Sequence, residues 1–287
     1  MKKISRRSFM AAAAVSVAAL ALTACGGSAS SAASSVASSA ASSEAASSAA
    51  SSEAASSAAA AELTTVEAGK LTMATNAAFP PYEMTTDAGE FEGIDVDTAK
   101  AIAEKLGLEL QIDDMDFDAA LLSVQQGKAD IVMAGVTVTD ERKAVMDFSD
   151  SYATGIQSII VPNDSDIASP DDLAGKTIGT QRGTTGYIYC SDDFGDENVV
   201  AYDDGLTAVQ ALNNGQVDAV VIDNAPAQEF VAANPGLKVL DTSYAEEDYA
   251  IGMAKGSALE DAVNKALEEL KADGTLQAIV DKYINAN

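Results

Sequence analysis

The amino-acid sequence predicts an α/β fold with two lobes, and two observations lead to this prediction. From about Val66 to the end of the chain, apolar runs of strand length alternate with amphipathic helical patterns, as in α/β folds whose strands are mostly parallel. A short pattern also occurs twice, as QGKAD at 126–130 and NGQVD at 214–218, where a helical stretch ends at glycine and an aspartate precedes an apolar strand. Two similar units predict two lobes, with a ligand crevice at the carboxyl ends of the strands.

The elements of the first unit are the clearest. The helical pattern between its first two strands places apolar side chains on one face at intervals of three and four residues. Asp95 or Asp97 fits the N-cap of this helix, and Gly107 fits its C-terminal turn. The predicted order is a strand at 71–75, a helix at 95–107, a strand at 108–112, a helix at 117–128 and a strand at 130–135.

The beginning of the chain does not have the composition of a globular domain. Four basic residues among the first seven precede an apolar run from Ala11 to Leu22. This run is shorter than the roughly 20 apolar residues that span a bilayer, so residues 1–24 are predicted to be a signal peptide. SRRSFM at 5–10 resembles the twin-arginine export signal, but paired arginines also occur in ordinary signal peptides, and both export routes stay open.

The apolar run ends in LTAC, which resembles the lipobox of bacterial lipoproteins. The resemblance predicts a lipid anchor on Cys25, which would become the first mature residue; the alternative is a chance cysteine behind a signal peptide. Two acyl chains on one residue suffice for stable attachment. From Gly26 to Ala61 the chain is almost wholly Ala and Ser, and SSEAASSAA at 42–50 recurs at 51–59. No large apolar group is available to bury, which predicts a flexible tether over 25–65.

The chain is strongly acidic. Its formal net charge is −27, and removal of the leader with its four basic residues leaves −31. Such a surface repels nucleic acid, which excludes nucleic-acid binding and favours a monomer. The absence of histidine excludes Ser-His-Asp and Cys-His catalysis and His-ligated metal sites, so neither a metal nor a cofactor is expected. Cys190 has no histidine beside it and is predicted to be a packing residue.

One cluster has the chemistry of an anion site. AGVTVTDERK at 134–143 ends a strand at Gly135, offers the hydroxyl of Thr137 and places Arg142 one turn into a short helix. Glycine lets a ligand approach the backbone closely, and a guanidinium can hold a carboxylate by two hydrogen bonds. Taken alone, the cluster favours a simpler interpretation, a capped helix with a solvated Arg-Lys pair.

Several other segments change that balance. They are FPPYE (79–83), FEGIDVDTAKAIAEKLG (91–107), MDFDAALLSVQQGKADI (115–131), DDLAGKTIGTQRGTTG (171–186), VDAVVID (217–223) and ADGTLQAIVDKY (272–283). With the AGVTVTDERK cluster, they resemble in order and spacing the type II periplasmic solute-binding proteins (family 3) of polar amino-acid ABC importers. The resemblance covers nearly all of 66–287. It implies a periplasmic-binding-protein-like fold, in which each lobe is a mostly parallel sheet flanked by helices and two hinge crossovers join the lobes.

The same resemblance implies a function and a carboxylate site. The protein would capture a small polar amino acid outside the cytoplasm, such as cystine, glutamine or another with an uncharged polar side chain, and deliver it to an ABC permease. Arg142 would hold the α-carboxylate, helped by the hydroxyl and N–H of Thr137. Thr184 and Thr185 lie where a strand gives way to a helix, so their N–H groups would present a positive helix end to the same carboxylate.

The ammonium group of the ligand would lie opposite. Asp223, at the end of the VVID strand, would accept hydrogen bonds from it together with the Gly135 carbonyl. One cation and one anion would then face a zwitterion, so that each buried charge meets its opposite. Asp223 could instead cap the helix that begins at Asn224, and both roles can hold.

Four further positions would surround the ligand side chain. Phe79 and Phe117 resemble the aromatic residues that sandwich it in the family. Asn76 stands where many relatives have aspartate, and Gln181 where several have lysine or another polar residue. An asparagine has no charge to offset a buried ammonium or guanidinium, which argues mildly against a dedicated arginine or lysine binder.

The chain is predicted to cross between the lobes twice, near 153–157 and 245–249. The first lobe would be 66–154 plus 249–287, and the second 155–248. A ligand that contacts both lobes would favour the closed state through those contacts.

Two other functions remain as alternatives on the same fold. Cyclohexadienyl dehydratases bind a carboxylate similarly and add a catalytic acid. The candidates for such an acid are Glu83, Asp114 and Asp116, none of which lies in a defined motif. A ligand-sensing lipoprotein would need a separate signalling partner. Transport is preferred over both, and the chain is expected not to be an enzyme.

Overall fold

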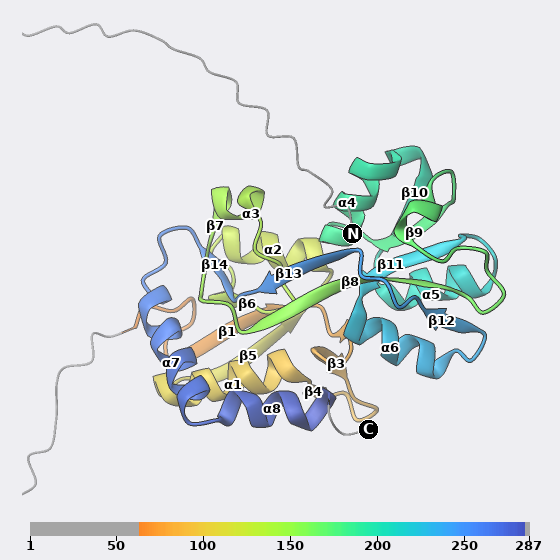
Figure 1. Cartoon of the computed structure of the whole chain (residues 1–287). Helices are drawn as coiled ribbons and strands as arrows, with labels where there is room; N and C mark the ends of the chain where they lie inside the picture. The colour runs from red at the N-terminus through yellow and green to blue at the C-terminus, as the bar shows by residue number, and fades with distance from the viewer. Residues whose placement is uncertain (1–62, 285–287) are drawn as a thin grey trace, which may run out of the picture. The chain divides into compact units, whose positions relative to one another are not determined.

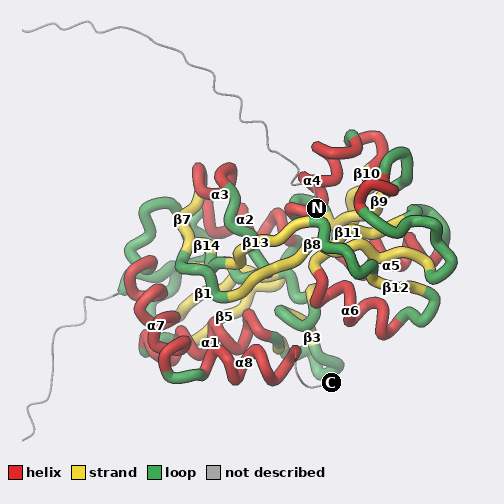
Figure 2. The backbone as a smooth tube through the Cα atoms, in the orientation of Figure 1, coloured by secondary structure: helices red, strands yellow, loops and turns green. Residues whose placement is uncertain are grey.

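The computed structural model describes residues 63–284. The predictions of a signal peptide at 1–24 and of an anchor at Cys25 lie outside the described residues, as does nearly all of the predicted tether. Two main sheets, each flanked by helices, make up the described part (Figure 1 and Figure 2).

We call the part built on the first sheet the first lobe. Its strand order is β5 (Glu109–Asp114), β1 (Lys70–Thr75), β6 (Ile131–Val132), β14 (Gly252–Ala254) and β7 (Met146–Phe148). β1 pairs in parallel with β5 and β6, whereas β14 is antiparallel to β6 and β7. Its helices are α1 (Ile94–Leu106), α2 (Phe117–Gln125), α3 (Asp140–Val145), α7 (Glu260–Ala272) and α8 (Thr275–Ile284). A small antiparallel sheet contains β2 (Ala78–Phe79), β3 (Glu83–Thr85) and β4 (Phe91–Glu92).

The part built on the second sheet is the second lobe. Its strand order is β10 (Val199–Tyr202), β9 (Ile178–Gln181), β11 (Ala219–Asp223), β8 (Ala153–Pro162) and β12 (Leu237–Val239), and β13 (Ala245–Tyr249) also pairs with β8. β9 is parallel to β10 and β11, while β8 is antiparallel to β11, β12 and β13. The helices are α4 (Thr185–Phe194), α5 (Gly205–Asn213) and α6 (Asn224–Ala233), with 3₁₀ turns at Pro170–Leu173 and Asp196–Asn198.

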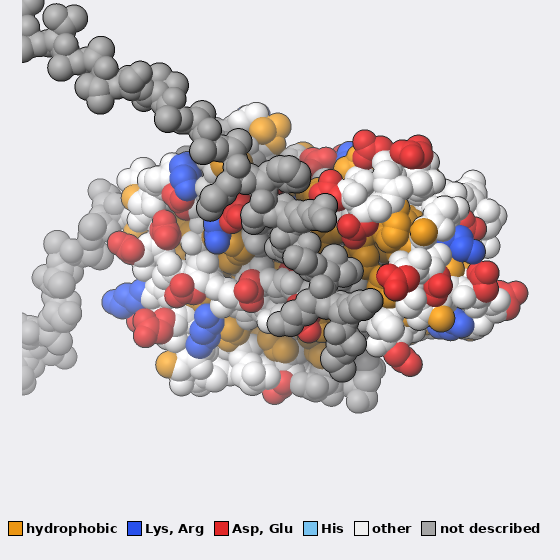
Figure 3. All heavy atoms as spheres, turned by 45° about the horizontal axis from the view of Figure 1, so that its top comes forward, with side chains coloured by type: hydrophobic (Ala, Val, Ile, Leu, Met, Phe, Trp, Pro, Cys, Tyr) orange, Lys and Arg blue, Asp and Glu red, His pale blue; other side chains and the backbone are white. Residues whose placement is uncertain are grey.

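The predicted α/β fold class is confirmed, with one refinement. Parallel pairing holds for three strands of each sheet, and the remaining strands are antiparallel. β1 and β11 are buried along almost their whole length, as expected for strands covered by helices on both faces. Acidic side chains are spread across the face shown in Figure 3. Within residues 63–284, no helix is long and apolar enough to cross a membrane.

The chain passes between the two sheets twice. It leaves β7 of the first sheet for β8 of the second, and it returns from β13 to β14. The two connecting strands pair antiparallel with each other, from Ala153 opposite Tyr249 to Gln157 opposite Ala245. These are the two segments for which we predicted crossings, and the lobe boundaries themselves stay a prediction.

The repeated sequence pattern has the same structural role in both lobes. The carboxylate of Asp130 accepts a hydrogen bond from the N–H of Thr72 in β1 at 2.7 Å, and that of Asp218 accepts one from the N–H of Thr177, just before β9, at 2.8 Å. Each aspartate is therefore hydrogen-bonded to the backbone near the beginning of a parallel strand, β1 in the first lobe and β9 in the second. The predicted glycine turn after α1 is also confirmed, since Gly107 has left-handed dihedral angles.

The start of α1 differs from the prediction. Neither Asp95 nor Asp97 is the N-cap, which is Gly93 with φ of 134°. The first two amide groups of the helix donate to the backbone carbonyls of Pro81 and Tyr82, at 3.0 and 2.8 Å. Because the backbone satisfies these donors, no side-chain cap is needed, and the Asp95 carboxylate is buried inside the lobe.

Substitution of Gly93 tests this junction. A Cβ atom at this position would collide with the backbone carbonyl of Tyr82, and the φ of 134° is unfavourable for any residue with a side chain. We expect Gly93→Ala to lower the free energy of unfolding by roughly 1–3 kcal/mol beyond the control, measured by urea denaturation. Gly89→Ala is the matched control, because Gly89 also has positive φ but no atom within 4 Å of the added methyl. Equal losses in both variants would contradict the proposed crowding.

Candidate ligand-binding site

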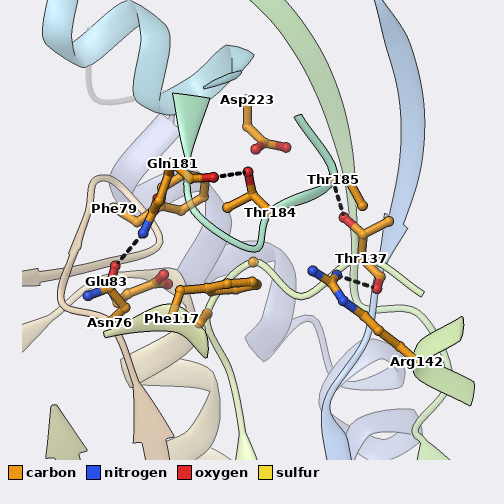
Figure 4. A pocket seen from close by; sticks show the side chains of 12 residues that line it. Asn76, Phe79, Glu83, Phe117, Thr137, Arg142, Gln181, Thr184, Thr185 and Asp223 are labelled. Carbon is orange, nitrogen blue, oxygen red and sulfur yellow. Dashed lines mark hydrogen bonds between the residues drawn. The ribbon is translucent and has the colours of Figure 1, made fainter. Parts of the chain in front are cut away.

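A pocket between the lobes brings together all ten residues predicted to contact a ligand (Figure 4). The empty space within it is about 300 Å³, part of which is open to solvent. The lining residues are Asn76, Phe79, Glu83, Phe117, Ala134, Gly135, Thr137, Arg142, Gln181, Thr184, Thr185 and Asp223. Glu83 and Ala134 were not among the predicted ligand residues.

Arg142 is a buried cation at one end of the pocket. The Thr139 hydroxyl caps α3 by accepting from the Arg142 N–H at 3.2 Å, which fixes the start of this short helix. The guanidinium donates to the carbonyl of Thr137 at 2.8 Å and, across the lobes, to that of Gly183 at 3.1 Å. It also lies 5.3 Å from the centre of the Phe117 ring, within the range of a cation–π contact. The simpler interpretation, a solvated surface arginine, is therefore wrong for the side chain of Arg142, which is 8% exposed.

The two threonines at the start of α4 differ in their roles. Thr184 is the N-cap, and its hydroxyl accepts from the Tyr187 N–H at 3.3 Å. Its own N–H donates to the Gln181 carbonyl at 3.4 Å, so this predicted donor is already engaged. Thr185 is buried, and its hydroxyl donates to the carboxylate of Glu247 at 3.0 Å. The positive end of α4 nevertheless lines the pocket through both residues.

Asp223 ends β11 with its side chain in the pocket, as Figure 4 shows. It occupies the N-cap position of α6, but its side chain makes no capping hydrogen bond. Instead, the Tyr249 hydroxyl donates to its carboxylate. Burial raises the pKa of Asp223 to about 7, although the Tyr249 hydrogen bond acts in the opposite direction. Asp223 is therefore the N-cap residue of α6, as the alternative predicted, but its carboxylate makes no capping hydrogen bond.

Gly135 accommodates an aromatic ring. Its φ is 54°, and a Cβ atom there would lie 2.9 Å from the Phe79 ring and 3.4 Å from that of Tyr249. Its N–H donates to the Asp95 carboxylate at 3.0 Å. The glycine therefore leaves room for the rings that form the pocket wall as well as for a ligand.

The two amide side chains predicted to influence specificity contact each other. The Gln181 amide donates to the side-chain oxygen of Asn76 at 2.8 Å, and that of Asn76 donates to the Met115 carbonyl at 3.0 Å. The Asn76–Gln181 hydrogen bond links the two lobes on the side of the pocket opposite Arg142, as seen in Figure 4.

Glu83 is the residue that sequence reasoning missed as a ligand contact. Its side chain is 0% exposed and lines the pocket, yet neither carboxyl oxygen receives a hydrogen bond from an N–H or hydroxyl group of residues 63–284. Burial, and next the charge of Asp95, raise its pKa well above the ordinary value. In the sequence, the only sign of a ligand contact here is that Glu83 directly follows the FPPY segment. The sequence analysis considered Glu83 only as a candidate catalytic acid.

The other two candidate acids lie elsewhere. Asp114 and Asp116 are exposed and do not line the pocket; the Asp114 carboxylate accepts from the Ala77 N–H at 2.8 Å. Cys190 is fully buried, and burial raises the pKa of its thiol to about 12, as suits a packing residue. Residues 63–284 contain no cluster of Cys, Asp and Glu that could hold a metal ion.

The raised pKa of Asp223 predicts how stability depends on pH in the ligand-free protein. An unfolded aspartate has a pKa of about 3.9, whereas the folded value is about 7, so the folded state binds this proton more tightly. The resulting stabilisation is complete below about pH 4 and is lost as the pH rises to about 7. We expect the stability of the wild type relative to Asp223→Asn to fall between about pH 4 and pH 7, measured by urea denaturation. A constant difference over that range would contradict the prediction.

Comparison with known proteins shows which family the chain belongs to. The model of the bacterial extracellular solute-binding proteins, family 3, matches residues 71–286. The L-cystine-binding protein TcyJ of Escherichia coli (strain K12) is 33% identical, over 77% of this chain and 85% of TcyJ. The arginine-binding extracellular protein ArtP of Bacillus subtilis (strain 168) is 34% identical, over 75% of this chain and 86% of ArtP.

A solved structure shows the same fold. The arginine-, lysine-, histidine-binding protein ArtJ from Geobacillus stearothermophilus aligns with a TM-score of 0.73 and 35% identity, covering 76% of this chain and 96% of ArtJ. TcyJ, ArtP and ArtJ are named for the amino acids that they bind and not as enzymes, which confirms the expectation of a binding protein. The chain therefore belongs to the bacterial extracellular solute-binding proteins of family 3.

Proposed function

We propose that the protein binds a free amino acid between its two lobes and presents it to an ABC importer. Arg142 and Asp223 carry this proposal, because a buried cation and a buried carboxyl group line one pocket and come from different lobes. A zwitterionic amino acid would offer each of them its opposite charge, so that no charge is buried alone. Phe79 and Phe117, each 6% exposed, provide apolar walls for the ligand side chain.

Glu83 favours a ligand with a cationic side chain, and arginine first. A guanidinium would supply hydrogen-bond donors and a positive charge to Glu83, which has the Asp95 carboxyl group as its neighbour, and would lower the raised pKa of Glu83. This differs from the uncharged polar ligand, such as glutamine or cystine, that we expected from Asn76 alone. The names of ArtP and ArtJ support arginine, and that of TcyJ supports cystine. Arginine, cystine and glutamine therefore all belong in a binding test.

The family is extracellular, which supports a location outside the cytoplasm. We propose in addition that Cys25 carries a lipid anchor and that 25–65 is a tether. The lipobox-like LTAC and the Ala/Ser composition support these two assignments. The same proposal includes a monomeric protein with lobes at 66–154 plus 249–287 and at 155–248, and an ABC permease as its partner.

A binding screen tests the proposed function. The chain from residue 25 onward, carrying Cys25→Ser, is unfolded and refolded to remove carried-over ligand and is then screened with the twenty amino acids and cystine by thermal shift. A ligand at 100 times its dissociation constant adds about 2.7 kcal/mol of stability. We expect a clear shift with one or a few polar amino acids. The absence of any shift would contradict the proposal.

The role of Arg142 is tested with the ligand that the screen identifies. Arg142→Ala should weaken binding about 30-fold or more, because removal of one partner of a buried charged hydrogen bond costs about 2–5 kcal/mol. Calorimetric titration measures the affinity. Arg182→Ala is the matched control, since Arg182 is about half exposed and pairs with Asp203 at the surface. Wild-type affinity in a folded Arg142→Ala variant would show that the carboxylate lies elsewhere.

Glu83→Gln separates the possible ligand classes. If the side chain is cationic, we expect affinity for arginine to fall about tenfold or more, which corresponds to at least about 1.4 kcal/mol. Affinity for glutamine should change much less, because a neutral amide gains little from the charge of Glu83. Equal changes for the two amino acids, measured by calorimetric titration, would contradict the assignment of Glu83 to a cationic group.

A further inference from the structure

Glu247 is a buried carboxylate next to the pocket and is not itself among the proposed ligand contacts. It lies on β13, the strand by which the chain returns to the first lobe, directly opposite Gly155 of β8. Its side chain is 7% exposed. Its neighbours along the strand, Glu246 and Asp248, are exposed, as alternation on a strand requires.

One oxygen of Glu247 accepts three hydrogen bonds from both lobes. The Thr137 hydroxyl of the first lobe donates to Oε2 at 3.1 Å, and the Thr185 hydroxyl of the second lobe donates to the same atom at 3.0 Å. The Gln157 amide of β8 donates to it at 3.0 Å. The two threonine oxygens are only 3.4 Å apart, so this carboxylate holds two ligand-site hydroxyls together across the lobes.

These hydrogen bonds compete with a ligand. A threonine hydroxyl has one proton, and an ionised carboxylate can only accept. While Thr137 and Thr185 donate to Glu247, neither can donate to the α-carboxylate of an amino acid. The positive charge of Arg142 is also partly offset already: burial lowers its pKa, and the negative charge of Glu247 is the largest influence that raises it.

We propose that Glu247 is an internal substitute for the ligand's carboxylate. In the empty protein it accepts the threonine hydrogen bonds and offsets Arg142, which holds the two lobes together. When an amino acid enters, its carboxylate takes over these donors and repels Glu247. The residue thus lowers the affinity for the ligand and stabilises the closed, empty state. The claim that Glu247 lowers the affinity for the ligand rests on the proposed amino-acid function. The claim that Glu247 stabilises the closed, empty state does not.

Glu247→Gln tests both halves, in the chain from residue 25 with Cys25→Ser. The amide oxygen can still accept from the threonines, so the shape of the site is kept while the charge is removed. We expect the affinity for the amino acid with the largest thermal shift to rise about tenfold, or about 1.4 kcal/mol. Glu246→Gln, an exposed neighbour on the same strand, is the control and should stay within about twofold, a few tenths of a kcal/mol.

The empty state is measured without a ligand. Spin labels at Ala144→Cys in α3 and Asp192→Cys in α4, both exposed, report the separation of the lobes, and the buried Cys190 is not expected to react. Glu247→Gln should shift the ligand-free distances toward larger values, and Glu246→Gln should not. If Glu247→Gln does not fold, Glu247→Asp, with its carboxylate withdrawn by one methylene, should give smaller changes in the same directions.

The outcomes separate the two proposals. Unchanged or weaker affinity in Glu247→Gln, or unchanged ligand-free distances, would overturn the role of Glu247. If the wild type binds no amino acid, the proposed function fails, and the distance measurement alone still decides whether Glu247 closes the empty protein.

Discussion

The charge of Arg142 is buried between two lobes, and much of the pocket is arranged around that constraint. An isolated buried charge is strongly unfavourable, so it must be hydrogen-bonded and paired. The guanidinium donates to carbonyl groups on both lobes. The negative charge of Glu247, on the strand that connects the lobes, counteracts the lowering of the Arg142 pKa by burial. The guanidinium of Arg142 can keep both hydrogen bonds only while the lobes are closed, and these hydrogen bonds in turn stabilise the closed arrangement.

The connecting strands also contribute directly to the site. Tyr249, at the end of β13, is fully buried and donates to Asp223 in the second lobe, while its ring packs edge-on against that of Tyr82 in the first. Gly155 on β8 has no side chain because a Cβ atom there would collide with the Tyr249 ring. A motion that separates the lobes must therefore alter the surroundings of Asp223 as well as those of Arg142. The same residues therefore contribute to ligand binding and to lobe closure, so the two can be coupled without a chain of intermediate residues.

Strand and helix periodicity supported the fold class, and a repeated motif supported the two similar units. The resemblance to the family supplied ten of the twelve residues that line the pocket. The sequence did not reveal the carbonyl caps on α1, since Pro81 and Tyr82 approach the helix only in three dimensions. Glu83 and Glu247 were missed for a related reason. From the sequence alone, an acidic residue in a short strand is expected to face solvent. Only the three-dimensional packing shows that the side chains of Glu83 and Glu247 are buried.

The pairing of β8 with β13 brings together the two points where the chain enters and leaves the second lobe, with Ala153 opposite Tyr249. The second lobe is therefore an insertion in the sequence of the first, which we call the cassette. Its first and last strands, β8 and β13, are hydrogen-bonded to each other. Because its two ends are neighbours, replacing this lobe would leave both junctions at the same place in the first lobe. Since Asp223, Gln181 and the start of α4 lie on the cassette and Arg142, Asn76 and Glu83 lie outside it, recombination at this pair of strands would create new pairings of half-sites in a single step.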